Sequence, residues 1–279
     1  MKSARSMKHC LKIPIKTGVG LFLIGIAGLA ACNPSEPFPA ASSPAVQIIS
    51  LATTPAVSAW EGVFSSCAAG LPGVGLVTDE YPPDRIGQSG SDIRLSAGNI
   101  PGLPGAVSFA LGQDEITVIA HSANPVTDLD FQSLFDLFSG KIKTWDTLAS
   151  ASGQKGLASL PVQIWSYPDG DEVRKFFDQA VDPDLQGPSS NANSLIVYTA
   201  PDPQAMITAV GQNPGAIGYV LKSSLVNSSQ ASLVHPVSLD AAASPTLAVN
   251  IRAELKAQPQ GALQQLLLCV QAKKAYSPP

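Results

Sequence analysis

Short apolar runs recur along the chain, and each ends at a turn-forming or polar segment. Such runs predict buried β-strands, because four to eight apolar residues bounded by breakers are typical of strands in a packed sheet. The predicted strands cover residues 46–52, 75–78, 107–111, 116–120, 160–166, 215–219, 236–239 and 246–251.

Other segments place apolar residues at helical spacing. One predicted helix has its apolar stripe at Phe131, Leu134, Phe135 and Phe138, and a second has its stripe at Val173, Phe176, Phe177 and Ala180. Both stripes follow the i, i+3, i+4, i+7 pattern of an amphipathic helix. The first helix can begin at Asp128 or Asp130 and end at Gly140. Strands that alternate with helices predict an α/β protein.

The first predicted strand runs directly into Thr53, Thr54 and Pro55. Thr54 can cap a following helix, and Pro55 suits the first helical position. A strand that brings hydroxyl groups to a helix N-terminus creates a natural anion site, because free N–H groups and the helix dipole point the same way. Simple capping by threonine is the alternative.

The N-terminal segment has the composition of an export signal. Residues 1–31 contain five Lys or Arg and no acidic residue, and residues 19–31 form an apolar run too short to span a membrane. The run closes with Leu-Ala-Ala before Cys32, which resembles a bacterial lipobox. We therefore expect residues 1–31 to be a lipoprotein signal peptide and Cys32 to be acylated and anchored in the bilayer. A plain signal peptide followed by an unrelated cysteine is the alternative.

Residues 32–44 are expected to form a tether, since residues 33–44 hold four prolines and three serines. Removal of the signal leaves 12 of the 17 basic residues against 21 acidic ones, a formal charge of −9. This charge argues against nucleic acid and acidic lipid surfaces as partners. It does not exclude a small anion, which local N–H groups and hydroxyls can hold.

Two of the four cysteines remain for the folded body. Cys10 leaves with the signal and Cys32 is the expected lipid site, so Cys67 and Cys269 are the remaining pair in an oxidising compartment. They can form a disulfide, or they can pack as two buried thiols.

Residues 121–145 resemble a segment of periplasmic phosphate-binding proteins and related type II solute-binding proteins. The shared features are Asn-Pro-Val at 124–126, Phe-Ser-Gly-Lys-Ile at 138–142, and Trp145. Residues 214–219, Pro-Gly-Ala-Ile-Gly-Tyr, match a second step of that family. The resemblance implies a two-lobed α/β fold, with mixed sheets flanked by helices and a cleft between the lobes.

The resemblance also implies a division of the chain. Residues 45–115 would begin lobe 1, residues 116–218 would form lobe 2, and residues 219–279 would return to lobe 1. Cys67 and Cys269 would then lie on helices of the same lobe, as a disulfide requires.

Ser91 and Asp92 match a Ser-Asp step of the family, whose aspartate accepts the proton of a protonated oxyanion. With Thr53 and Thr54 they would form the lobe 1 half of a ligand site. A surface turn ahead of a strand is the alternative, because Gly-Ser-Asp is common turn composition.

The second ligand loop departs from the family pattern R-x-x-G-S-G-T. Alignment on Asp169 and Gly170 puts Tyr167 at the arginine, Asp171 at the serine, Glu172 at the second glycine and Val173 at the threonine. Two carboxylates would thus face the place of an anion, where like charges repel. The ligand would then be cationic, zwitterionic or a polar metabolite, with Tyr167, Asp171 and Glu172 as contacts. Alternatively, Asp169 or Asp171 caps the helix and points away.

The N-terminal segment predicts an exported, lipid-anchored protein, and the resemblance implies a solute-binding protein that hands its ligand to an ABC permease. It would be a monomer without a cofactor. A surface sensor or adhesion protein on the same fold is the alternative, and a secreted hydrolase is a third. An enzyme is not expected, because the body has only His121 and His235 and lacks local motifs for a metal or a nucleophile.

Overall fold

The computed structural model describes residues 46–98, 105–152, 159–181, 197–240 and 247–273. The predicted signal peptide, Cys32 and the tether lie outside the described residues. Within the described part of the chain, no helix is both long and apolar enough to cross a membrane.

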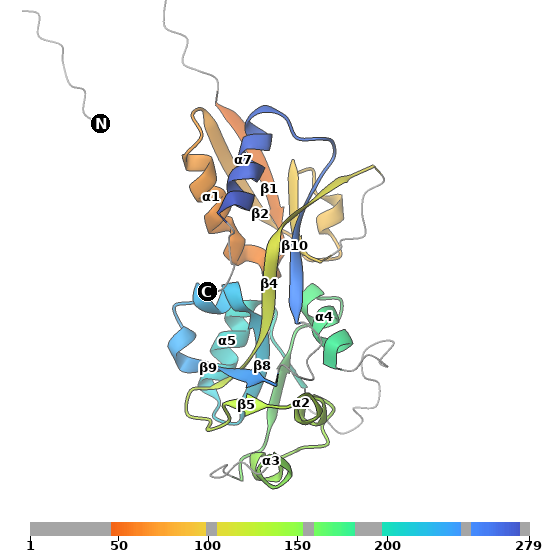
Figure 1. Ribbon diagram of the computed structural model, residues 1–279, viewed down its shortest axis with the longest axis vertical. Coiled ribbons are helices and arrows are strands. Elements are labelled where there is room, and N and C mark those ends of the chain that lie inside the picture. Colours follow the sequence, from red (N-terminus) through yellow and green to blue (C-terminus); the bar gives the residue numbers. More distant parts are fainter. Residues whose placement is uncertain (1–45, 99–104, 153–158, 182–196, 241–246, 274–279) are drawn as a thin grey trace, which may run out of the picture. The chain divides into compact units, whose positions relative to one another are not determined.

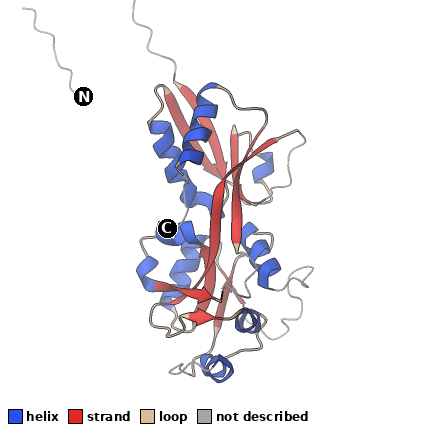
Figure 2. Ribbon diagram, viewed as in Figure 1, coloured by secondary structure: helices blue, strands red, loops and turns tan. Residues whose placement is uncertain are grey.

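A ten-stranded mixed sheet organises these residues (Figures 1 and 2). Its first half, the first half-sheet, has the order β2, β1, β3, β10, β4. Strand β1 pairs in parallel with both β2 and β3, and β10 runs antiparallel to β3 and β4. The bounds are β1 (Gln47–Thr53), β2 (Val74–Glu80), β3 (Ile93–Ala97), β4 (Val107–His121) and β10 (Ala248–Leu255).

Strand β4 continues into the other half, the second half-sheet. There it pairs antiparallel with β8 and β9, and β8 is followed by β6 and β7. The bounds are β5 (Asp128–Leu129), β6 (Gln163–Ser166), β7 (Val197–Thr199), β8 (Ala216–Leu221) and β9 (Val234–Leu239). The two strands predicted for residues 107–111 and 116–120 are therefore one strand of 15 residues.

Residues 112–115, which separate the two predicted strands, are glycine or polar, yet they are extended and paired within β4. Asp114 is buried, and its Oδ1 accepts hydrogen bonds from the N–H groups of Glu115 and Ser223. A buried carboxylate is tolerated only where donors replace its lost water. Residues 112–115 also stay in register with β10.

Helices flank both half-sheets. Asp130 caps α2, where its side chain accepts from the Ser133 N–H, and Asp202 caps α5 in the same way through the Ala205 N–H. The bounds are α1 (Glu61–Ala69), α2 (Phe131–Phe138), α3 (Trp145–Ser152), α4 (Glu172–Val181), α5 (Pro203–Gln212), α6 (Lys222–Val226) and α7 (Gly261–Ala272), with 3-10 turns η1 (Pro55–Trp60), η2 (Ile86–Gln88) and η3 (Ala231–Leu233).

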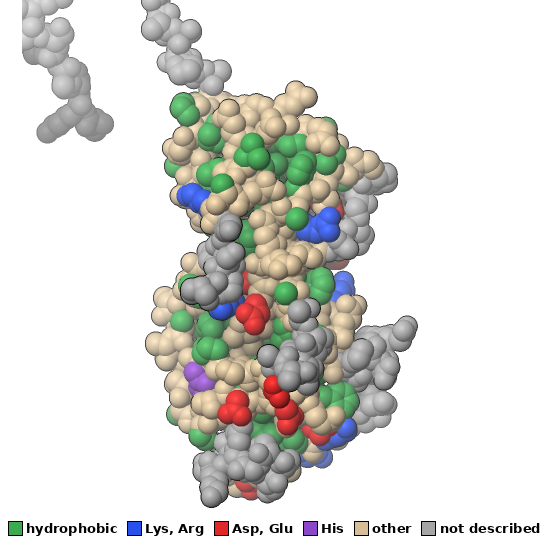
Figure 3. Space-filling view, in the orientation of Figure 1, with side chains coloured by type: hydrophobic (Ala, Val, Ile, Leu, Met, Phe, Trp, Pro, Cys, Tyr) green, Lys and Arg blue, Asp and Glu red, His purple; other side chains and the backbone are tan. Residues whose placement is uncertain are grey.

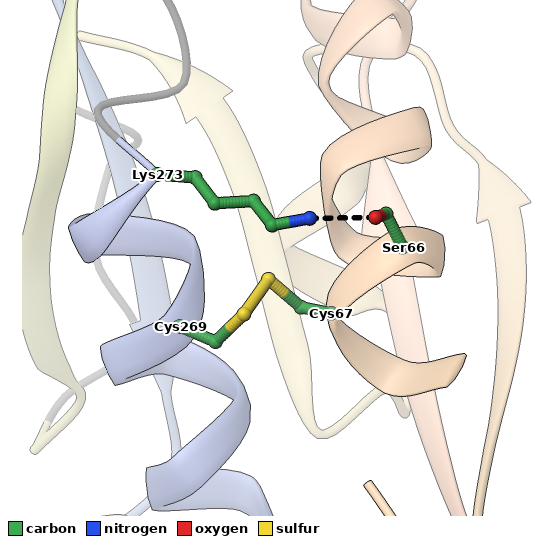
Figure 4. Close-up of a disulfide and its surroundings, with 4 residues drawn as sticks. All are labelled: Ser66, Cys67, Cys269 and Lys273. Carbon is green, nitrogen blue, oxygen red and sulfur yellow. Dashed lines mark hydrogen bonds between the residues drawn. A yellow bond between two sulfur atoms is a disulfide. The ribbon is translucent and has the colours of Figure 1, made fainter. Parts of the chain in front are cut away.

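The predicted disulfide between Cys67 and Cys269 is present and joins α1 to α7 (Figure 4). One turn further along α7, Lys273 Nζ donates to Ser66 Oγ at 2.6 Å. The pair of cysteines closes a separation of 202 residues. It therefore ties the beginning and the end of the described chain together.

Candidate functional site

Three segments converge on one carboxylate at the start of α4. Glu172 Oε2 accepts hydrogen bonds from Thr54 Oγ1, at 3.0 Å, and from the Ala97 N–H, also at 3.0 Å. Thr54 follows β1, and Ala97 ends β3. Because β1 and β3 are parallel neighbours, their carboxyl ends lie side by side and present both donors to the same group.

Burial changes the acid strength of Glu172. Only 9% of the residue is exposed. Burial raises its pKa to about 7, although the hydrogen bonds from Ala97 and Thr54 act in the opposite direction. The neighbouring Asp171 charge adds to the rise, and Lys175 lowers it.

Asp171 is the N-cap of α4. Its Oδ1 accepts from the Arg174 N–H at 3.0 Å. Burial raises the pKa of Asp171, while hydrogen bonds from the backbones of Arg174 and Val173 oppose the rise. The structure therefore shows Asp171 as a cap, but the residue also lines a pocket, so its ligand role stays a prediction.

Thr53 and Thr54 do not cap η1. The N-cap position is held by Thr54, but no side-chain cap bond forms there, because its hydroxyl donates to Glu172 instead. Thr53 Oγ1 donates to Glu61 Oε1 at 2.8 Å. Pro55 does occupy the predicted first turn. Thr54 thus occupies the N-cap position without the side-chain cap bond of the alternative interpretation, and both hydroxyls donate to carboxyl groups.

Ser91 and Asp92 lie elsewhere. They precede β3, at the opposite end of that strand from Ala97. Asp92 Oδ2 accepts from the N–H and the hydroxyl of Ser50, at 2.9 and 2.8 Å. The structure therefore does not bring Ser91 and Asp92 to Thr54, and their ligand role stays a prediction.

The residues of the loop before α4 that were predicted at the ligand site have different surroundings. Tyr167 is buried to 2% exposure and packs edge-on against Tyr219, with ring centroids 5.5 Å apart. Asp169 points to solvent, where Arg174 Nη1 pairs with it at 2.7 Å. Gly170 has a φ of +89°, a left-handed conformation that glycine allows without strain and that turns the chain into the helix.

A pocket of about 300 Å³ lies between this loop and the segment after β2. Its lining carries four carboxylates and one aromatic side chain, and none of its lining residues is Lys or Arg. The lining residues are Pro55, Glu80, Tyr81, Pro82, Pro83, Asp84, Pro168, Asp169, Gly170, Asp171 and Pro201. We call this the acidic pocket.

Negative charge accumulates beside the acidic pocket. Burial raises the pKa of Glu80, and repulsion from Glu61 and Asp202 raises it further. A second pocket, of about 340 Å³, shares Glu80 and Pro55 and adds Asp202 to the lining.

Figure 3 draws one face of the molecule without labelling the acidic pocket. On that face, most Asp and Glu side chains lie over the part that holds the second half-sheet.

Sequence reasoning missed Glu80, Tyr81, Asp84 and Ala97. Glu80 ends β2, and Tyr81 and Asp84 follow it in a segment without a family motif. Ala97 acts through its backbone N–H, which no side-chain pattern reveals. Among the described residues, no three His, Cys, Asp or Glu side chains form a group that could hold a metal ion.

Solved structures with the same fold include transport and regulatory proteins. A protein assigned as a phosphate ABC transporter substrate-binding protein from Clostridium perfringens, with bound phosphate, is 18% identical, has a TM-score of 0.66, and matches over 82% of this chain and 98% of its own. An ABC-type phosphate transport receptor from Vibrio cholerae is 15% identical, with a TM-score of 0.54 over 82% and 95%. The reduced OxyR regulatory domain from Pseudomonas aeruginosa is 9% identical, with a TM-score of 0.56 over 81% and 98%.

A search of curated protein sequences gives no match. The structural matches show that the fold is that of the two-lobed periplasmic binding proteins, as the sequence predicts. Residues 97–268 match the family model of the PBP superfamily domain, which covers more than half of the 279 residues. The chain belongs to the PBP superfamily.

Proposed function

We propose that this chain is the exported solute-binding component of an ABC-type uptake system and that its solute carries a positive charge. The observation that carries the charge assignment is the lining of the acidic pocket, with four carboxylates and no basic side chain. The transport role is supported by the fold shared with substrate-binding proteins and by the signal-like N-terminal segment.

A cation in the acidic pocket would relieve repulsion that the free protein bears. Glu80 pairs with Thr53 through its backbone, but among the described residues no side chain forms an ion pair with its carboxylate, which is repelled by the charges of Glu61 and Asp202. A unit charge about 4 Å from a carboxylate gains about 1 kcal/mol in water and about 4 kcal/mol near a protein surface. The ring of Tyr81 in the same lining suits an ammonium group, which aromatic faces attract.

The loop before α4 supports the same conclusion. Tyr167, Asp171 and Val173 stand where the resembled family has an arginine, a serine and a threonine. Each lost hydrogen bond to a charged ligand is worth roughly 1.5–3 kcal/mol. Loss of all three would weaken an oxyanion by at least about a thousandfold relative to a complete site.

The remaining parts of the proposal concern placement and partners. Acylated Cys32 would anchor the protein in the bilayer, residues 32–44 would hold it off the surface, and an ABC permease would receive the solute. Residues 45–115 and 219–279 would form one lobe and residues 116–218 the other. The protein would act as a monomer through hinge closure.

Thermal-shift measurements on the purified protein test the solute class. Spermidine, putrescine, arginine and choline are compared with phosphate, sulfate and glucose, since a ligand that binds only the folded state raises the melting temperature. We expect at least one cation to raise it and the oxyanions to leave it unchanged. The double variant Glu80→Gln/Asp84→Asn should lose the response. A rise with phosphate alone would contradict the proposal.

A sensor on the same fold is a second candidate. Regulatory domains of OxyR and of Synechocystis CcmR, the latter in complex with 2-PG, share the fold with TM-scores of 0.56 and 0.57. A sensor would keep its role when the permease is deleted, whereas a transport component would not. Uptake of the labelled solute by cells with and without this protein separates the two.

A further inference from the structure

The contact between Thr54, Ala97 and Glu172 has the composition of a bound oxyanion. A hydroxyl and a backbone N–H, from two neighbouring strand ends, both donate to one carboxyl oxygen. Thr54 is fully buried and Glu172 nearly so, and the three residues are separated by 43 and 75 positions in the chain. The negative group is part of the protein itself.

We propose that Glu172 is a built-in anion, a specificity-determining residue that fills the oxyanion donors of the first half-sheet and excludes free oxyanions from them. Charge-assisted hydrogen bonds of this kind are about twice as strong as neutral ones. A free oxyanion could take the two donors only by displacing Glu172. The displaced carboxylate would lose both partners, which is costly for a buried charge.

The donors on the opposite side are filled as well. In α4, the N-terminal N–H groups would otherwise be free to bind an anion. Here Asp171 accepts from the Arg174 N–H, so the helix caps itself. The adjacent residues Asp171 and Glu172 therefore supply one carboxylate to each half of the potential oxyanion site.

The end of β3 lies against α4. Gly98 follows Ala97 with a φ of +77°, and a Cβ at this position would lie 2.3 Å from the Phe176 ring of α4. The end of β3 thus packs directly against the helix that carries Glu172. Because the carboxylate is tethered to this helix, its effective concentration at the donors far exceeds that of a free ion.

This inference deepens the proposed function and rests on it, because it gives a structural reason why a protein with the fold of phosphate receptors would not bind phosphate. Its test does not use the solute. A negative result here and a negative result in the cation screen are therefore distinguishable.

Chemical rescue tests the proposal. In Glu172→Ala, the donors of Thr54 and Ala97 become available, so formate, a detached carboxylate, should bind there and raise the melting temperature. Calorimetric titration with formate should give at least about tenfold tighter binding to Glu172→Ala than to the wild-type protein. Phosphate and sulfate should show the same preference.

Two control variants separate this effect from a loss of charge. Glu172→Gln keeps an acceptor in place and should not bind formate, and Asp79→Ala removes an exposed carboxylate from β2 and should behave as the wild-type protein. A folded Glu172→Ala variant that binds formate no better than the Gln variant would overturn the proposal.

A measurement on the unaltered protein covers the case in which Glu172→Ala does not fold. The Ala97 amide resonance should shift as Glu172 titrates, because its N–H donates to that carboxylate. Asp171 and Lys175 are the other charged groups that act on Glu172, so the same titration is recorded for Glu172→Gln. If the Ala97 amide titrates equally in both proteins, or in neither, Glu172 is not the resident anion.

Discussion

Thr54 and Glu172, 118 residues apart in the sequence, share a buried hydrogen bond of 3.0 Å between the end of β1 and the start of α4. Thr54→Val removes the donor and keeps the shape of the side chain. A lost hydrogen bond to a charged group costs about 1.5–3 kcal/mol, so we expect the free energy of unfolding to fall by that amount.

Urea unfolding checks this expectation, with Ser58→Ala as the control. The Ser58 hydroxyl donates to the Pro55 carbonyl of its own turn, a neutral acceptor, and its loss should cost less. If both variants lose the same free energy of unfolding, the hydrogen bond between Thr54 and Glu172 stabilises the protein no more than an ordinary neutral hydrogen bond.

Glu172 should make stability depend on pH. Its pKa rises from 4.5 to about 7 on folding, so the folded state binds more protons than the unfolded state between these values. Stability should therefore fall as pH rises from about 4.5 to about 7 and then level off, with a total change of at most about 3 kcal/mol. Asp171 and Asp178, whose pKa values are also raised by burial, act in the same direction.

Comparison with Glu172→Gln isolates the share of Glu172. Unfolding free energies are measured at about pH 5 and about pH 8 for both proteins. The difference between the two pH values should be smaller in the variant. An identical difference would assign the pH dependence to Asp171, Asp178 and Glu80, whose pKa values are also raised.

Loss of the disulfide between Cys67 and Cys269 should destabilise the protein strongly. Replacement of both cysteines by alanine should lower the free energy of unfolding by about 3–5 kcal/mol, because the bond closes a loop of 202 residues. Peptide mapping without reduction should recover the two cysteines in one linked species. Recovery of two separate peptides with free thiols would contradict the pairing.

Cys32 should carry the lipid anchor. Cys32→Ser should release the protein from the membrane fraction of expressing cells, since the proposed lipid would be attached to that sulfur. If the variant partitions into the detergent phase as the unaltered protein does, the protein is attached to the membrane by a group other than Cys32.

The sequence predicts the elements whose side chains repeat with a clear period. The bounds of α2, its cap at Asp130, which is one of the two predicted candidates, and Gly140 just beyond its end are found where the pattern places them. The buried face differs, because Leu134 and Leu137 are buried while Phe131, Phe135 and Phe138 are only partly so. The continuity of β4 is not predictable in this way, because residues 112–115 are polar or glycine and are held extended by β10 and by the burial of Asp114.

The site is less predictable, for a physical reason. Thr54 precedes a Pro55 turn, as a capping residue would, but its hydroxyl donates to Glu172 instead, because the fold brings that carboxyl group within hydrogen-bond distance. The donor at Ala97 is a backbone group and leaves no side-chain signal. Hydrogen bonds between distant segments depend on how these segments pack.

Calorimetric titration of the unaltered protein with phosphate and with spermidine, near neutral pH, tests the central claim most directly. The account predicts measurable binding of spermidine and no phosphate binding tighter than the high micromolar range, because Glu172 and Asp171 already fill the oxyanion donors while the acidic pocket attracts a cation. A submicromolar dissociation constant for phosphate, with no heat from spermidine, would contradict it.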